Sequence, residues 1–290
     1  MSKEAVAKVR LEVVPSADLL TQLPAAFDTT ESVSVTCLPH HGPARTVQTS
    51  VNLARLGYHT VPHLAARSIT GEAELNSLLL QLQEAGVSEL FLVDGDRRTP
   101  AGPYSWSGEL LEAVNAYSPD FSIGIAGYPE GHPHLSQEHL SSLLMKAPLA
   151  SSMVTQMCFS AEAISRYLRK IRKSGIQIPV WVGVPGPVSV GKLVSLGARL
   201  GVGRSLKLAH GTGMAGAIWR RGDFLSYDSG RLIREVHQEL AGDPLFAGFH
   251  VYTFNDLGRL PGLLDDLRAL QRTSTLAPGS TFIPLFPAKI

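Results

Sequence analysis

The sequence predicts an α/β fold, a (βα)8 barrel formed as one domain by residues 1–290. Three observations carry this prediction: eight short apolar or β-branched runs, helix-like stretches between them, and a length of 290 residues, which is normal for a single α/β barrel. An open, doubly wound sheet is the alternative, but it would need the strand order to reverse somewhere. Eight is the number of strands that closes a barrel, so the closed form is favoured.

The predicted strands are runs of six or seven residues that carry no helical periodicity. They cover residues 9–14, 32–37, 58–64, 89–95, 121–127, 151–156, 178–184 and 248–254.

Two stretches between the strands show clear helix signals. Residues 72–86 place four leucines on one face and end at a glycine. Residues 160–175 begin with Ser160 as a cap and end with basic residues and a glycine. The segment 201–246 is longer than one crossover requires, and residues 231–242 predict an extra helix before the last strand. No linker or shift in composition divides the chain.

Composition excludes several classes of function. The chain is 44% hydrophobic and 18% charged with a net charge of +1, so it has a large core and no basic field for nucleic acid or anionic lipid. No window approaches 18 uninterrupted apolar residues, so no membrane span is expected. The N-terminus does not resemble a signal peptide, and the only cysteines, Cys37 and Cys158, have no CxxC spacing. We therefore expect a reduced, cytoplasmic protein that acts on a small molecule; its oligomeric state stays open.

Polar residues stand at the carboxyl end of nearly every predicted strand. In a closed barrel these ends converge on one mouth, where the chemistry takes place. The residues at these ends are Glu12, Thr36, His63, Asp96, Tyr128, Glu130, Gln156, Pro185 and Thr253, and all but Pro185 carry a polar side chain, which predicts a polar ligand.

Metal and dinucleotide motifs are weak. His40 and His41, like His132 and His134, are loop pairs, and the first strand carries a Glu where metal-dependent barrel hydrolases carry HxH, so we expect no metal site. The GTGMAG stretch at 211–216 matches GxGxxG but is followed by a poor start for a dinucleotide-binding unit, so we treat it as accidental.

The strand ends read "LEVVPS" (11–16), "SVTC" (34–37), "VPHLAARS" (61–68), "LFLVDGD" (90–96), "IGIAGYPEGHP" (123–133), "VTQMCF" (154–159), "IPVWVGVPGPVS" (178–189) and "FHVYTFN" (249–255). In this order they resemble the motifs of the methylenetetrahydrofolate reductases, and the stretch 123–133 is the most specific match. The resemblance implies a (βα)8 barrel that reduces 5,10-methylenetetrahydrofolate to 5-methyltetrahydrofolate.

The resemblance also implies roles for site residues. Glu12 falls on the general acid that opens the imidazolidine ring of the substrate, and neighbours such as Val13 and Val14 would raise its pKa by desolvation. Asp96 falls on the catalytic carboxylate that binds the pterin and stabilises the cationic intermediate. Gln156 falls on the amide that contacts folate. Structural alternatives are an ion pair of Glu12 with a neighbour such as Arg10, a turn cap for Asp96, and a hydrogen bond at the edge of the core for Gln156.

Further residues complete the predicted site. Tyr128, Tyr252 and Phe254 are assigned to the folate, and Thr36, His63, Tyr104 and Phe159 to the nicotinamide cofactor. Phe159 could instead sandwich the aminobenzoate ring with Phe254, and either phenylalanine could equally belong to the core. The alternative for Tyr104 is packing on its own scaffold, and the alternative for Tyr128 is shaping a rigid loop.

The chain departs from the family where the flavin is held. The Arg of the Leu-Arg-Gly-Asp turn is Asp94, the basic cluster after the YPEGHP motif is reduced to Lys146, and the Arg after the Tyr-Thr-Leu-Asn motif is Asp256. A carboxylate disfavours a nearby pyrophosphate. We therefore expect no FAD and a direct hydride transfer from NADH, with NADPH also open. The alternatives are an FAD-dependent reductase and a folate-binding barrel without reductase activity.

Overall fold

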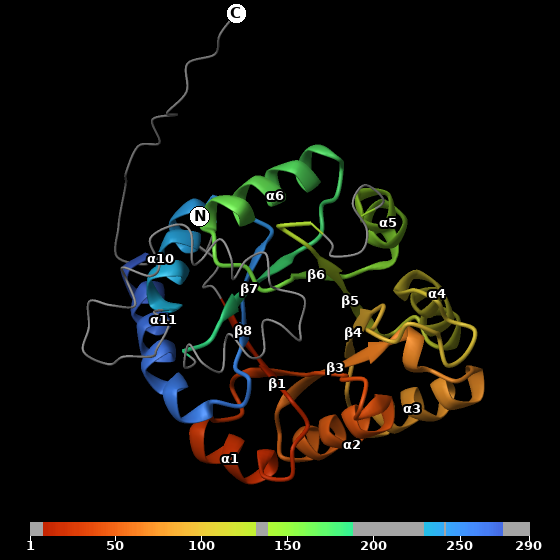
Figure 1. The fold of residues 1–290 in the computed structure, drawn as a ribbon. Coiled ribbons are helices and arrows are strands. Elements are labelled where there is room, and N and C mark those ends of the chain that lie inside the picture. The colour runs from red at the N-terminus through yellow and green to blue at the C-terminus, as the bar shows by residue number, and fades with distance from the viewer. Residues whose placement is uncertain (1–7, 132–138, 188–228, 241, 275–290) are drawn as a thin grey trace, which may run out of the picture.

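A computed structural model describes residues 8–131, 139–187, 229–240 and 242–274 of the chain. These residues form a closed barrel of eight parallel strands in which spatial order follows chain order, with helices on the outside (Figure 1). Pairing of the first strand with the last closes the ring, with Arg10 opposite His250 and Glu12 opposite Tyr252. The predicted closed barrel is therefore confirmed, and the open sheet is excluded.

The strands are short, and most lie within two residues of their predicted bounds. They are β1 (Lys8–Val13), β2 (Ser32–Val35), β3 (His59–Ala65), β4 (Glu89–Val93), β5 (Ser122–Gly127), β6 (Ser152–Thr155), β7 (Val180–Pro185) and β8 (Phe246–Tyr252).

The last strand was predicted two residues too late. It begins at Phe246, which pairs with Val180, and it ends at Tyr252 rather than at residue 254. The chain leaves the extended conformation at Phe254 and Asn255, whose φ angles are +50° and +56°. Positive φ is incompatible with a strand, and neither residue is a glycine that would announce the turn.

Helices surround the barrel, and the two best-supported helix predictions are confirmed. The α-helices are α1 (Leu19–Ala26), α2 (Gly42–Arg55), α3 (Glu72–Glu84), α4 (Ser107–Tyr117), α5 (His139–Lys146), α6 (Ala161–Lys173), α10 (Ser229–Leu240) and α11 (Leu260–Ser274), and the short 3-10 helices are η1 (Ala66–Ser68), η2 (Ala147–Leu149) and η3 (Leu257–Arg259).

Capping and placement agree with the sequence signals. The Ser160 hydroxyl accepts a hydrogen bond from the backbone N–H of Ala163 at 3.2 Å, as expected of the cap of α6. Helix α10 lies where residues 231–242 predicted a helix before the last strand. The preceding stretch, with the glycine-rich residues 211–216, lies outside the described residues.

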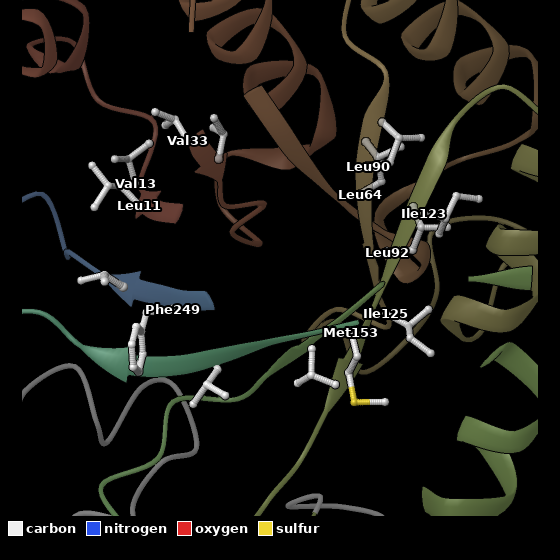
Figure 2. Close-up of a cluster of buried hydrophobic side chains, with 14 of the residues drawn as sticks. Leu11, Val13, Val33, Leu64, Leu90, Leu92, Ile123, Ile125, Met153 and Phe249 are labelled. Carbon is white, nitrogen blue, oxygen red and sulfur yellow. The ribbon is translucent and has the colours of Figure 1, made fainter. Parts of the chain in front are cut away.

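Side chains alternate along each strand between the hydrophobic core under the helices and the inside of the barrel. Side chains that point outward from the strands pack under the helices in the main hydrophobic core, and several of them are labelled in Figure 2, including Leu11, Val13 and Phe249. Inside the barrel, a smaller apolar cluster of Val61, Phe91, Val154 and Trp181 is separate from that core. Arg10 and Glu12 alternate with Leu11 and Val13 on β1, so both point into the barrel.

No helix in the described part of the chain has the length and apolar character needed to cross a bilayer.

Candidate active site

Glu12 lies inside the carboxyl end of the barrel. It is the last inward-pointing residue of β1, it pairs in register with Ser34 on β2 and Tyr252 on β8, and its side chain is only 14% exposed. The ionisable side chain therefore sits where the strands converge, which is where barrel enzymes carry out their chemistry.

Two histidines face the Glu12 carboxyl group. Nε2 of His250 lies 3.0 Å from Glu12 Oε2, within hydrogen-bond distance, and Nε2 of His63 lies 3.8 Å from the same oxygen. The alternative of an ion pair between Glu12 and Arg10 is wrong, because Arg10 pairs with Glu89 at 2.8 Å. Within the described residues, no lysine or arginine forms an ion pair with Glu12.

Burial determines which of these groups is protonated. Desolvation raises the pKa of Glu12 to about 7, and the charge of His63 opposes the rise. Desolvation lowers the pKa of His63 to about 4, against the opposing pull of Glu12. The pKa of His250 falls to about 3 because of burial and, next, the positive charge of Arg10. Near pH 7 the histidines are therefore neutral, and a large fraction of Glu12 carries its proton.

The loop after β8 holds the backbone around Glu12. Thr253 donates to the Glu12 carbonyl oxygen from its N–H at 3.2 Å and from its hydroxyl at 2.6 Å. The Asn255 amide accepts from the Val14 N–H and donates to the Val14 carbonyl, both at 2.8 Å. We call these contacts of Thr253 and Asn255 with Glu12 and Val14 the Asn255 clamp. They form because the backbone turns into the left-handed region at Phe254 and Asn255. Sequence reasoning missed the clamp because neither of these two residues is a glycine.

Asp96 lies apart from this buried group. It is exposed at the mouth, beyond Gly95 with φ of +86°. The nearby Asp94 takes the turn-capping role considered for Asp96, because its Oδ1 accepts from the Ser107 N–H at 2.7 Å at the start of α4. The charges of Asp94 and then Asp96 add to burial in raising the pKa of Tyr128, so Asp96 acts electrostatically on the phenol at the end of β5.

The remaining residues assigned to folate lie around the mouth. The Tyr252 hydroxyl donates to the Thr155 carbonyl at 3.2 Å, and its ring meets that of His250 edge to face at 5.1 Å between centroids. Burial raises the pKa of Tyr252, so its phenol stays protonated. Gln156 follows β6 and is half-buried, and its side-chain amide forms no hydrogen bond to the described residues. Phe254 is half-buried beyond β8.

The residues assigned to the nicotinamide cofactor divide into two groups. Thr36 and His63 line the mouth: the buried Thr36 hydroxyl has no hydrogen-bond partner in the described part of the chain, and His63 Nε2 lies 2.7 Å from the Ser34 hydroxyl. Phe159 is half-buried just after β6. Tyr104 is buried in the main hydrophobic core, and packing there favours its structural alternative.

Glu12, His63 and His250 also form a possible set of metal ligands. One ligand atom from each lies within 4.8 Å of the others, and two imidazoles with a carboxylate are ligands that divalent transition metals accept. The histidines considered in the sequence are different ones. His40 and His41 lie near each other in a loop, with 4.1 Å between ring centroids, and His132 and His134 lie outside the described residues.

Sequence reasoning missed His250. The motif at 249–255 was recognised, but only Tyr252, Thr253 and Phe254 were singled out from it. Strand alternation could have found the histidine, because His250 and Tyr252 are two residues apart and therefore share the inward face of β8.

Comparisons with known proteins agree with this architecture. Residues 25–196, more than half of the chain, match the family model for methylenetetrahydrofolate reductase. "Methylenetetrahydrofolate reductase 2" of Saccharomyces cerevisiae is 25% identical over 241 residues, covering 78% of this chain and 38% of the relative. The Escherichia coli "5,10-methylenetetrahydrofolate reductase" is 25% identical over 134 residues, covering 45% of each protein. The chain thus matches less than half the length of these relatives.

A solved structure has the same fold at low sequence identity. The "Uncharacterized protein from Clostridium thermocellum" that "binds two copies of 5-methyl-5,6,7,8-tetrahydrofolic acid" superimposes with a TM-score of 0.63 at 10% identity, covering 93% of this chain and 96% of that one. Glu12 and His250 lie outside the residues matched by the family model, so their place in the site rests on the geometry above.

Proposed function

The chain belongs to the methylenetetrahydrofolate reductase family, and we propose that it reduces 5,10-methylenetetrahydrofolate to 5-methyltetrahydrofolate with NADH, without a bound flavin and with Glu12 as general acid. The observation that carries this proposal is a carboxyl group buried in the barrel mouth, with a pKa raised to about 7 and no lysine or arginine of the described residues paired with it. A carboxylic acid can serve as a proton donor near neutral pH only if its environment keeps it protonated there.

Glu12 provides the proton that opens the substrate. Transfer of its proton to one nitrogen of the imidazolidine ring breaks the bond from that nitrogen to the bridging carbon and leaves an iminium ion. A hydride from the nicotinamide then adds to the iminium carbon and forms the methyl group. Glu12 is left as a carboxylate and takes a proton from solvent before the next turnover, so one proton and one hydride are consumed per cycle.

Polar groups at the mouth suit a pterin with its hydrogen-bonding edge. In this proposal the exposed Asp96 carboxylate accepts from pterin N–H groups and stabilises the cationic intermediate, and the Gln156 amide offers a donor and an acceptor to the same ring. The phenol of Tyr252 donates to the Thr155 carbonyl, so in this proposal its ring, and not its hydroxyl hydrogen, lines the folate side of the mouth. Folate binding by the Clostridium thermocellum protein is compatible with a folate site in a barrel of this kind.

The residues in the flavin region fit FAD poorly. Asp94 stands where the family has an arginine, and its carboxylate is committed to the N-terminus of α4. Lys146, the only cation from 131 to 146, is buried, and its Nζ donates to the Ser107 hydroxyl at 3.1 Å. A site for a dianionic pyrophosphate needs positive charge and free N–H groups. Here the Ser107 N–H is bound by Asp94, and the Lys146 ammonium group is bound to the Ser107 hydroxyl.

The nicotinamide would then contact the substrate directly. Hydride transfer requires the donor and acceptor carbons to approach to about 3–3.5 Å, so the mouth must hold both ligands face to face. Thr36 and His63 are the candidates to line the nicotinamide side, because the Thr36 hydroxyl is buried without a partner in the described residues. The choice of NADH over NADPH is part of the proposal, and parallel assays with both cofactors test it.

One purification and one assay test the proposal. The protein is purified, its visible spectrum recorded, and NADH oxidation followed with methylenetetrahydrofolate and no added flavin, for wild type, Glu12→Gln and the exposed control Glu112→Gln. We expect a colourless, active wild type, an unchanged control, and a Glu12→Gln variant that binds both ligands but turns over at least ~100-fold more slowly. Tightly bound FAD would contradict the flavin-free claim, folate binding without NADH oxidation would indicate a carrier, and full turnover of Glu12→Gln would exclude its role as acid.

A further inference from the structure

His250 makes a contact that the proposed chemistry leaves unexplained. Its side chain is fully buried on β8, and Nε2 lies 3.0 Å from Glu12 Oε2. The other ring nitrogen, Nδ1, is also buried and has no hydrogen-bond partner among the described residues. Only one of the two ring nitrogens is therefore hydrogen-bonded, which is unusual for a buried imidazole.

This asymmetry determines the tautomer of a neutral imidazole. Such a ring carries one N–H, on Nε2 or on Nδ1. If Nδ1 carried the hydrogen, a buried N–H donor would lack an acceptor. If Nδ1 carries only a lone pair, a buried acceptor lacks a donor, which costs less free energy. The proton therefore belongs on Nε2, where it meets a carboxyl oxygen.

We propose that His250 is a positioning residue that donates its Nε2–H to Oε2 of Glu12 and thereby confines the acidic proton to Oε1, the oxygen left for the substrate. This inference rests on the proposed function, in which Glu12 is the proton donor. Among the described residues His250 is the sole hydrogen-bond partner of the Glu12 carboxyl group. Oε1 has no hydrogen-bond partner in the same residues, and we assign it to the substrate.

The second histidine does not duplicate this contact. His63 Nε2 is 2.7 Å from the Ser34 hydroxyl and 3.8 Å from Glu12 Oε2, beyond hydrogen-bond distance. The rings of His63 and Phe91 also pack edge to face, with 4.7 Å between centroids. His63 thus contributes its dipole and bulk, while His250 fixes the carboxyl orientation.

The charges around the pair keep His250 neutral. Arg10 on β1 faces His250 from below and disfavours an imidazolium, while Glu89 on β4 opposes that effect less strongly. Tyr252 on the same strand is a protonated phenol, and His63 on β3 is neutral near pH 7. A neutral donor orients Glu12 without forming an ion pair, so the acid can release its proton and regain it.

The two tautomers predict opposite pH behaviour when His250 is removed. A hydrogen bond donated to Glu12 favours its ionised form, so losing that bond raises the pKa of the acid. If instead Nε2 accepted the Glu12 proton, losing the bond would lower this pKa. The fall of kcat/KM at high pH, its basic limb, reports the loss of the proton from Glu12 in the free enzyme. A shift of this limb to higher pH in the variant therefore indicates the Nε2–H tautomer, and a shift to lower pH indicates the Nδ1–H tautomer.

Two substitutions make the test. His250→Gln places an amide N–H at the position of Nε2, and His250→Phe keeps a ring but removes the donor. For NADH oxidation with methylenetetrahydrofolate, we expect the basic limb of His250→Phe to move up by about one pH unit, with the plateau reduced about tenfold because the carboxyl group is less well oriented. His250→Gln should keep the wild-type limb. A limb in His250→Phe that stays in place or moves down would overturn the inference.

An independent measurement does not require turnover. Nitrogen-15 NMR of the histidine side chains, with the His250 resonances identified by their loss in His250→Gln, reports which nitrogen carries hydrogen. We expect the neutral Nε2–H tautomer at pH values around neutrality. A Nδ1–H tautomer or an imidazolium would refute the inference. An inactive wild type would refute the proposed function alone, since the NMR result stands apart from it.

Discussion

Arg10 pairs with Glu89 at 2.8 Å across the barrel interior, although Glu12 lies only two residues away on the same strand. The Arg10 guanidinium also lies over the Trp181 ring, 4.2 Å from its centroid, and donates to the Ser32 hydroxyl at 3.3 Å. The N–H groups of Arg10 are thereby bound to Glu89 and Ser32 and not to Glu12. Among the described residues, Glu12 faces two neutral histidines and no lysine or arginine, and a buried carboxyl group without a counter-charge keeps its proton to a higher pH.

Removing one partner of the Arg10–Glu89 pair will destabilise the fold. Glu89→Gln leaves the guanidinium buried without a counter-charge, and we expect the free energy of unfolding to fall by about 3 kcal/mol. The double variant Arg10→Met, Glu89→Gln should recover most of this loss. Urea unfolding of the single and double variants measures the difference, with Glu112→Gln on the surface as the control. Equal stability of Glu89→Gln and wild type would show that the pair is not buried.

Glu12→Gln will be more stable than wild type in alkaline solution. The pKa of Glu12 is raised from 4.5 to about 7 in the folded state, so folding favours the protonated form and wild type loses stability as pH rises through this window. The variant lacks this loss, and we expect it to be more stable by about 3 kcal/mol at about pH 8 and by about 1 kcal/mol at about pH 5. The two histidines have lowered pKa values and destabilise both proteins as pH falls below about 6.5, so their effect cancels in the comparison. A stability gap that is the same at both pH values would contradict the assigned pKa.

The Asn255 clamp will affect both stability and rate. Asn255→Ala removes two hydrogen bonds to Val14 and leaves a residue with a Cβ at φ of +56°, so we expect a loss of about 2 kcal/mol in the free energy of unfolding. Asn255→Gly also loses the bonds but adopts positive φ without strain, so it should lose less. Both variants should turn over more slowly, with the basic limb of their pH profile unmoved. Denaturant unfolding and pH profiles of the two variants test this, and a greater loss in the glycine variant would refute it.

Chelators should leave the enzyme fully active. The proposed mechanism uses Glu12 as a proton donor and His250 as a hydrogen-bond donor, although these groups and His63 could also bind a metal. Zinc bound there would displace the acidic proton, so added Zn²⁺ should inhibit and EDTA should reverse the inhibition. The rate of NADH oxidation before and after dialysis against EDTA measures this. Loss of activity that is restored by a divalent metal would replace the acid mechanism with a metal-dependent one.

The fold was predictable because its signals are local. Strand-length apolar runs, the Ser160 cap and the leucine face of residues 72–86 each lie within one element, and the count of strands then selects the barrel. The place of Glu12 at the end of β1 was predictable for the same reason.

The partners within the site were not predictable, because they depend on contacts between distant parts of the chain. Arg10 and Glu89 are 79 residues apart, and Asn255 and Val14 are 241 apart. Nothing in the sequence near Arg10 indicates that it turns to Glu89 instead of Glu12. Similarly, whether Asp94 or Asp96 caps α4 is decided by the left-handed turn at Gly95 between them.

Infrared difference spectroscopy of wild type against Glu12→Gln tests most directly whether Glu12 is a neutral acid near pH 7. The carbonyl stretch of a protonated carboxyl group, present in wild type and absent from the variant, is followed as pH is raised. We predict that this band persists in mildly acidic solution and disappears with a midpoint of about 7. A Glu12 carboxyl that is already ionised at about pH 5, as an ordinary surface glutamate would be, would contradict the account.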